Sequence, residues 1–183
     1  MSVIDRSRAE LFGTELAIFR DFVSKVSSIM VGHAWYPAFD QERTPASLSR
    51  RVVTDLLKTE LGFRGLILTD DLDMGAIVNE FGLPETISRA IVAGNDLAMI
   101  CHRIGLVEEA AAVLAGMEAK ALDGALEAVA VFKRKLSPPD KFSYNRFNEL
   151  NARIWELRVG VLGAERAAQR SPEDGKRSPV ELY

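Results

Sequence analysis

The sequence predicts an α/β protein built around a parallel sheet, and three observations support this class. Three short apolar runs, at residues 28–33, 65–69 and 97–101, are continuous rather than alternating, as strands covered on both faces are. Stretches of helical periodicity separate these runs, which is the pattern of repeated strand–helix units. Polar side chains follow every run, in the position where parallel α/β folds bind their ligands.

The first helix is predicted from a capping box and an apolar stripe. Ser7 and Glu10 have the spacing at which each side chain bonds the other residue's backbone amide. Apolar residues then recur at spacings of four and three, so we expect one helix that continues to Val26. That stripe consists of Phe12, Leu16, Phe19, Val23 and Val26.

The remaining elements follow from apolar faces and from glycines that stop helices. After the first strand, a helix over residues 45–61 is expected to end at Gly62, and a helix from Glu85 to Ala93 is expected to end at Gly94. The C-terminal part carries three further helical stretches and a tail rich in charge, Ser and Pro, which is expected to be disordered. These stretches are residues 106–122, 124–136 and 147–161, and the tail is residues 169–183.

Composition narrows the functional classes. The 183 residues favour one domain, with 48% hydrophobic and 27% charged residues as in ordinary soluble proteins. A net charge of -3 gives no electrostatic basis for binding nucleic acid or an anionic membrane. The single cysteine, Cys101, excludes an internal disulfide and fits a reducing compartment. With no apolar signal segment at the N-terminus and no membrane-length apolar run, we expect a cytoplasmic protein.

Polar residues at the strand ends are the candidate site. His33 follows the first strand, Asp70 and Asp71 the second, and His102 with Arg103 the third. Because the carboxyl ends of parallel strands share one edge of the sheet, we expect these groups to form one composite site.

The acidic pair has more than one interpretation from the residues alone. Adjacent residues on an extended chain point in opposite directions, so only one carboxylate faces a site, while the other is expected to cap a helix or bond loop backbone. The site carboxylate is suited to magnesium ligation, general-base catalysis or nucleophilic attack on a sugar. A receiver-type magnesium site fits poorly, because Asp96 precedes its strand and no suitable lysine follows the third strand. A structural cap and a functional carboxylate both remain open.

A family resemblance distinguishes among these chemistries. The chain reads IMVGHAWYPAFD from Ile29, PASLSRRVVTDLLKTELGFRGLILTDDLDMGAI from Pro45, and AIVAGNDLAMIC from Ala90. In this order and spacing the segments resemble the last third of the barrel in glycoside hydrolase family 3, of the bacterial β-N-acetylglucosaminidase type. The resemblance covers residues Val3 to Leu162, and its Thr-Asp-Asp-Leu-Asp-Met motif is specific.

The resemblance implies a fold, an activity and site residues. It implies a partial (β/α)8 TIM-type barrel over residues 1–168, made of the last three strands with their helices and followed by C-terminal helices. It also implies a retaining β-N-acetylhexosaminidase that acts on N-acetylglucosamine-containing saccharides in peptidoglycan recycling, with no metal or organic cofactor. Asp70 matches the nucleophile, Met74 is expected to line the sugar pocket, and His33 to face the site as a second substrate-binding residue. The structural alternatives are core packing for Met74 and a hydrogen-bonded loop histidine for His33, and for His102 the structural role is favoured.

The departures from the family pattern are also informative. A complete barrel takes about 250 residues, whereas the chain has 183. The family's Lys-His-Phe-Pro-Gly-His-Gly segment and its loop with a His-Asp acid/base pair have no counterpart, since the only histidines are His33 and His102.

We therefore expect an incomplete hydrolase that associates with itself or with a complementing N-terminal half. A split gene, a truncated reading frame and a degenerate remnant all fit. The alternative is a non-catalytic half-barrel that serves as an interaction or oligomerisation module.

Overall fold

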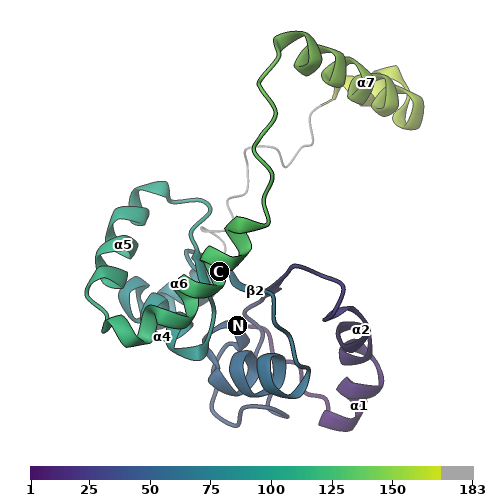
Figure 1. The fold of residues 1–183 in the computed structure, drawn as a ribbon. Coiled ribbons are helices and arrows are strands. Elements are labelled where there is room, and N and C mark those ends of the chain that lie inside the picture. Colours follow the sequence, from purple (N-terminus) through teal and green to yellow (C-terminus); the bar gives the residue numbers. More distant parts are fainter. Residues whose placement is uncertain (170–183) are drawn as a thin grey trace. The chain divides into compact units, whose positions relative to one another are not determined.

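The computed structural model describes residues 1–169, drawn with their helices and strands in Figure 1. Contacts divide the chain into one compact unit over Met1–Lys135 and a second that begins at Leu136. Apart from Gln169, the tail expected to be disordered lies outside the described residues. None of the helices in residues 1–169 combines the length and the apolar character needed to cross a bilayer.

In chain order the elements are α1 Arg8–Gly13, α2 Glu15–Phe22, β1 Ser28–Val31, η1 Ala46–Leu48, η2 Arg51–Glu60, β2 Leu66–Asp71, α3 Gly75–Phe81, α4 Leu83–Ala93, β3 Leu97–Met99, η3 Ile104–Leu106, α5 Val107–Ala115, α6 Ala119–Arg134, α7 Tyr144–Leu162 and α8 Ala164–Ala168.

The sheet has three parallel strands in the order β1-β2-β3, which confirms the predicted α/β class. Ser28 lies opposite Leu66 in the first pair of strands, and Asp71 lies opposite Met99 in the second. β2 is longer than expected, because it continues through the acidic pair instead of ending before it. The amide of Leu72 still donates to the Met99 carbonyl at 2.9 Å, so pairing with β3 extends the strand.

A buried aspartate joins β2 to the start of β3. The Asp96 carboxylate accepts hydrogen bonds from the Ile67 amide at 2.8 Å and from Lys58 Nζ at 3.2 Å, and the Asp96 amide donates to the Ile67 carbonyl at 2.7 Å. Further along, the buried hydroxyl of Thr69 accepts from the Met99 amide at 3.0 Å. These bonds compensate the burial of polar groups and place the ends of the two strands side by side.

Two apolar clusters form the core of the first unit. The first lies where β1 and β2 pack against η2, and the second lies around α3 and α4. The first cluster consists of Val31, Ala46, Val53, Leu57, Phe63, Ile67 and Ala93. The second consists of Leu48, Leu72, Ile77, Leu83, Ile87, Ala90 and Ala110. Since β2 contributes to the first cluster and Leu72 to the second, the acidic pair is held between two packed regions.

The predicted first helix is present but broken. The capping box is confirmed, with the Ser7 amide donating to Glu10 Oε2 at 2.8 Å and the Glu10 amide donating to Ser7 Oγ at 3.3 Å. The expectation of one continuous helix is wrong: Thr14, at φ -128° and ψ -92°, separates α1 from α2. The Thr14 hydroxyl donates to the Glu10 carbonyl at 2.7 Å, and Gly13 before it has a poor helix propensity. The apolar stripe continues across this break, which is why periodicity alone did not reveal it.

Two other helices differ from expectation in detail. η2 is a π-helix, in which the Leu61 amide reaches the Leu56 carbonyl, five residues earlier, at 2.8 Å. The Ala-rich segment breaks at Gly116, the C-cap of α5. The Gly116 amide donates the last hydrogen bond of that helix, to the Ala112 carbonyl at 3.0 Å. The sequence predicts this break near residue 123. Gly124 is instead tolerated inside α6.

The second unit is mainly α7. Ser143 caps this helix by accepting from the Arg146 amide at 3.3 Å, and Gly163 ends it with a positive φ of 78°. The apolar stripe predicted for residues 147–161 is therefore helical. Its large side chains, including those of Ile154 and Leu157, are exposed.

Candidate active site

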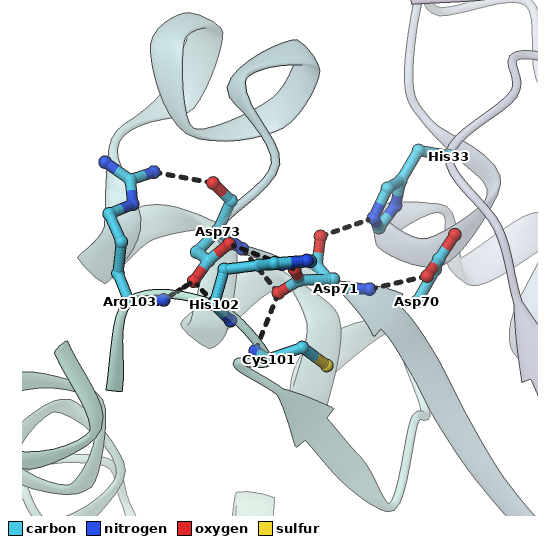
Figure 2. Close-up of polar contacts among 7 residues, drawn as sticks. All are labelled: His33, Asp70, Asp71, Asp73, Cys101, His102 and Arg103. Atoms are coloured by element: carbon cyan, nitrogen blue, oxygen red, sulfur yellow. Dashed lines mark hydrogen bonds and ion pairs between the residues drawn. The ribbon is translucent and has the colours of Figure 1, made fainter. Parts of the chain in front are cut away.

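Asp70 lies at the carboxyl end of β2 with its side chain partly exposed, whereas its neighbour Asp71 is buried. The Asp71 amide donates to Asp70 Oδ1 at 2.8 Å. Among the described residues, the second carboxylate oxygen of Asp70 has no hydrogen-bond partner. As Figure 2 shows, Asp70 lies on the His33 side of the cluster. This carboxylate is fixed through one oxygen and leaves the other for chemistry.

Asp71 is the member of the pair that bonds the loop backbone. Its Oδ1 accepts from the Cys101 amide at 3.0 Å and from the Asp73 amide at 3.2 Å, and its Oδ2 contacts Nδ1 of His102. The expectation that one of the two carboxylates would bond loop backbone is confirmed. Asp71 thereby joins the end of β2 to the segment after β3.

Asp73 is a site residue that the sequence reasoning missed. Its Oδ2 accepts from the Arg103 amide at 2.6 Å and the His102 amide at 3.2 Å, while its buried Oδ1 has no hydrogen-bond partner. Burial acts to raise the pKa of Asp73. The Arg103 amide, the side chain of Asp71, the His102 amide and the Arg103 charge outweigh it and lower that pKa below its ordinary value. The available signal was the third Asp of the Thr-Asp-Asp-Leu-Asp-Met motif, facing a polar group at the end of the next strand.

His33 is held at both ring nitrogens. Nε2 lies 3.0 Å from the Asp71 carbonyl and Nδ1 lies 2.7 Å from Ser47 Oγ. Since a carbonyl only accepts, Nε2 donates to it, and in the neutral ring Nδ1 accepts from the Ser47 hydroxyl. His33 therefore ties β1 and the segment of η1 to the acidic end of β2.

The three strand-end groups meet, as expected from the parallel sheet. His33 contacts Asp71, and Asp71 contacts His102, so one chain of polar contacts crosses all three strand ends (Figure 2). Met74 lies nearby as the N-cap of α3, partly exposed, with its carbonyl accepting from the Ile77 amide at 3.0 Å. The sequence-predicted residues thus occupy one edge of the sheet, with Asp70 as the carboxylate that has a free oxygen.

Neighbouring side chains have structural partners. Trp35 donates its indole N–H to the Asp40 carbonyl at 2.8 Å, and Tyr36 packs against the first core cluster. Desolvation and the carboxylates of Asp71, Asp73 and Asp70 raise the pKa of Cys101. This exposed thiol stays protonated at neutral pH, so it is a poor nucleophile.

Comparison with known proteins shows which family the chain belongs to. Residues 1–131 match the glycosyl hydrolase family 3 N terminal domain. The chain belongs to glycosyl hydrolase family 3. A β-hexosaminidase of Stenotrophomonas maltophilia is 35% identical over 106 residues, which are 57% of this chain and 31% of that protein. A β-hexosaminidase of Tolumonas auensis is 34% identical over 117 residues, or 62% of this chain and 33% of that protein. This family 3 chain therefore spans about a third of the length of these relatives.

Solved structures of the family agree with the fold. A family 3 β-N-acetylglucosaminidase from Paenibacillus sp. aligns with a TM-score of 0.68 and 31% identity, over 84% of this chain and 32% of that one. A β-N-acetylhexosaminidase from Beutenbergia cavernae aligns with a TM-score of 0.64 and 26% identity, over 72% of this chain and 40% of that one. The family 3 chain thus shares its strand and helix arrangement with part of each of these proteins.

Proposed function

We propose that this family 3 chain carries the nucleophile of a retaining β-N-acetylhexosaminidase, and that Asp70 is that nucleophile. The observation that carries the proposal is the exposure and hydrogen bonding of the Asp70 carboxylate. It is a partly exposed carboxylate at the carboxyl end of a parallel strand, with Oδ1 bound by the Asp71 amide and the other oxygen free of partners in the described part of the chain. Family membership, and relatives named for β-hexosaminidase activity, support the choice of a sugar as the electrophile.

The proposed reaction is a double displacement. The free oxygen of Asp70 attacks the anomeric carbon of a terminal β-linked N-acetylglucosamine, the bond to the leaving oxygen breaks, and a covalent glycosyl-enzyme forms. Water then attacks the same carbon, which releases the sugar and restores the Asp70 carboxylate. A second group must protonate the leaving oxygen and later deprotonate the water, and such assistance contributes about 10²- to 10⁴-fold in rate.

We propose that residues 1–168 form the last three strands, with their helices, of a (β/α)8 barrel. The other strands and the acid/base group would then come from chain outside this sequence, from a complementing polypeptide or through self-association. The support is the sheet itself: β1 lies at an edge and its Met30 side chain is 55% exposed. A barrel strand in this position pairs with a further strand, because closure removes free edges.

His33 and Met74 are proposed to contact the saccharide. Both lie at the same sheet edge as Asp70, and both are partly exposed. Since both ring nitrogens of His33 already have protein partners, this residue would offer the sugar its ring face. By family resemblance the substrate is an N-acetylglucosamine-containing saccharide released in peptidoglycan recycling in the cytoplasm.

A second candidate function is a non-catalytic half-barrel that serves as an interaction or oligomerisation module. The exposed edge of β1 and the exposed apolar side chains of α2 favour it. Under this alternative, Asp70 is a remnant and its substitution has no effect on the biological role of the chain.

Hydrolysis of a chromogenic β-N-acetylglucosaminide tests the proposal. The chain should be assayed alone and after mixing with the N-terminal two thirds of a family 3 β-hexosaminidase, beside Asp70→Asn and the surface control Asp123→Asn. We expect turnover that Asp70→Asn abolishes and Asp123→Asn retains. A fluorophenyl leaving group, which needs little protonation, should allow slow turnover without the acid/base group. If folded protein gives no turnover in any mixture with either leaving group, the non-catalytic module becomes the better account.

A further inference from the structure

We propose that Asp71, Asp73 and His102 bind a divalent transition-metal ion, for which zinc is the best match. Each residue offers one ligand atom, and the three atoms lie within 4.8 Å of one another. The group lies beside Asp70 but does not include it. The site is therefore separate from the proposed nucleophile, and its test does not depend on glycoside hydrolysis.

The two carboxylates are held in place for this role. Backbone amides bind one oxygen of each: those of Asp73 and Cys101 bind Asp71 Oδ1, and those of His102 and Arg103 bind Asp73 Oδ2. The other oxygen of each carboxylate is directed toward His102 Nδ1, as the contacts in Figure 2 show. Carboxylates oriented in this way by outer hydrogen bonds are typical of protein metal sites.

The unpartnered oxygen of Asp73 points to a missing cation. Asp73 is 0% exposed, and its Oδ1 has no hydrogen-bond partner in the part of the chain that the structure describes. A buried carboxylate oxygen is poorly tolerated without a donor or a positive charge beside it. The imidazole Nδ1 of His102 lies 3.6 Å from this oxygen, too far for a hydrogen bond.

The dimensions of the group suit a small metal ion. Tetrahedral zinc with ligands at about 2.1 Å holds its donor atoms roughly 3.4 Å apart, close to the 3.6 Å between His102 Nδ1 and Asp73 Oδ1. Asp71 Oδ2 lies closer to Nδ1 and must move apart to admit an ion. The His102 side chain is 39% exposed, so its ring can turn outward, and water can fill the open position on the metal.

The ligand chemistry selects the class of metal. One imidazole with two carboxylates suits zinc and its transition-metal neighbours, whereas magnesium and calcium prefer all-oxygen sites. Cys101 does not join the set, because it contributes its backbone amide and its sulfur is directed away from the carboxylates (Figure 2). The competing occupant is a proton on Nδ1, which would make His102 an imidazolium between two carboxylates.

Calorimetric titration of the metal-stripped full chain with zinc chloride tests the proposal. We expect one zinc ion per chain and a rise in the thermal unfolding midpoint, because the ion joins the segment after β2 to the segment after β3. Asp73→Asn and His102→Gln should weaken binding by at least about tenfold. The matched control is Asp123→Asn, which changes an exposed carboxylate of α6 outside the set and should leave the zinc affinity unchanged. His102→Gln alters an exposed side chain, so it tests the site even if Asp73→Asn fails to fold.

NMR of the imidazole rings locates the ion. The chain has only two histidines, so His33 serves as an internal reference for His102. We expect zinc to shift the His102 ring signals and leave those of His33 unchanged. The proposal is overturned if the stripped chain does not bind zinc, if His102→Gln binds it as tightly as the unaltered chain, or if only His33 responds.

Discussion

At the residue scale, the difference between Asp70 and Asp71 follows from strand geometry. Successive side chains of β2 point to opposite faces, so one carboxylate is buried against the amides of Cys101 and Asp73 and the other stays partly exposed. Two chemically identical neighbours thus have different roles. The buried carboxylate joins strand ends, and the exposed one is available to a ligand.

The first prediction separates these roles by stability. Asp71→Ala leaves the Cys101 and Asp73 amides without their acceptor, and the buried Asp73 amide by itself costs about 1–3 kcal/mol when it is unsatisfied. Asp70→Ala removes a partly exposed side chain, so its cost should stay within about 0.5 kcal/mol. Urea unfolding followed by circular dichroism measures both free energies of unfolding. Equal losses would contradict the assignment of Asp71 as the structural member of the pair.

The second prediction concerns the capping box of α1. Hydrogen bonds from the Ser7 side chain and the Ser7 amide hold the pKa of Glu10 below its ordinary value. A lowered folded-state pKa stabilises the fold above the unfolded pKa, and this contribution is lost as the pH falls through the folded pKa. Glu10→Gln should therefore lower the urea midpoint at pH 7, and the difference from the unaltered chain should disappear in strong acid. A difference that persists unchanged in acid would show that the carboxylate charge is not involved.

At the element scale, glycines decide where two helices stop and how closely they approach their neighbours. Gly94 ends α4 with a φ of 111°, and a Cβ added there would lie 2.4 Å from Thr54 Oγ1. Thr54 cannot move freely, because its hydroxyl donates to the Ala93 carbonyl at 2.7 Å. Gly62 after η2 also has a positive φ, 72°, but nothing lies within 4 Å of an added Cβ.

This pair of glycines gives the third prediction. Gly62→Ala should cost about 1 kcal/mol, the price of a left-handed backbone for a residue with a Cβ. Gly94→Ala adds the collision with Thr54 and should cost at least about 1 kcal/mol more, as overpacked sites do. Thermal unfolding of both variants measures the difference. Similar unfolding midpoints for the two variants would mean that the Thr54 side chain moves away from the added Cβ with no loss of stability.

At the scale of the whole molecule, the first unit leaves apolar surface uncovered beside an open strand. Ile18 and Phe22 of α2 are 63% and 51% exposed, and Met30 of the edge strand β1 is 55% exposed. These side chains line a shallow hollow between α2 and β1. Beside it lies a cavity of about 350 Å³, with a lining that is mostly apolar and includes Leu16 and Ile29. Exposed apolar patches next to an edge strand favour association.

The fourth prediction is that the chain associates through this surface. Sedimentation velocity should show a sedimentation coefficient that rises with protein concentration, and Phe22→Lys or Met30→Lys should reduce the rise. Val92 on α4 is 61% exposed and does not line the hollow, so Val92→Lys adds the same charge at a comparable exposed site outside it. Association that Val92→Lys reduces as much as Met30→Lys does would place the interface elsewhere.

Local patterns in the sequence were sufficient for the three strands, for several helix ends and for the neighbourhood of the site, but not for the breaks inside helices. Continuous apolar runs predicted three parallel strands, and the capping box at Ser7 and the terminal glycines Gly62 and Gly94 were recognisable without a structure. The family followed from ordered motifs that include Thr-Asp-Asp-Leu-Asp-Met. The position of polar residues directly after each strand also predicted that His33, the acidic pair and His102 would lie close together. These inferences succeed because strand direction and side-chain alternation are properties of the local chain.

Only the tertiary structure decided how the polar residues share their partners. The hydrogen bonds of Asp71 to Cys101 and of Asp73 to Arg103 span about thirty residues of chain, and no periodicity encodes such a distance. The break at Thr14 was hidden for a different reason, since a side-chain bond to the Glu10 carbonyl interrupted a helix without interrupting its apolar stripe. Which oxygen of each carboxylate is occupied, and which is left for a sugar or a metal, depends on backbone amides brought in by the neighbouring strand. The sequence by itself determined which groups gather at the sheet edge, and the packing of β2 against β3 determined what each of them is free to do.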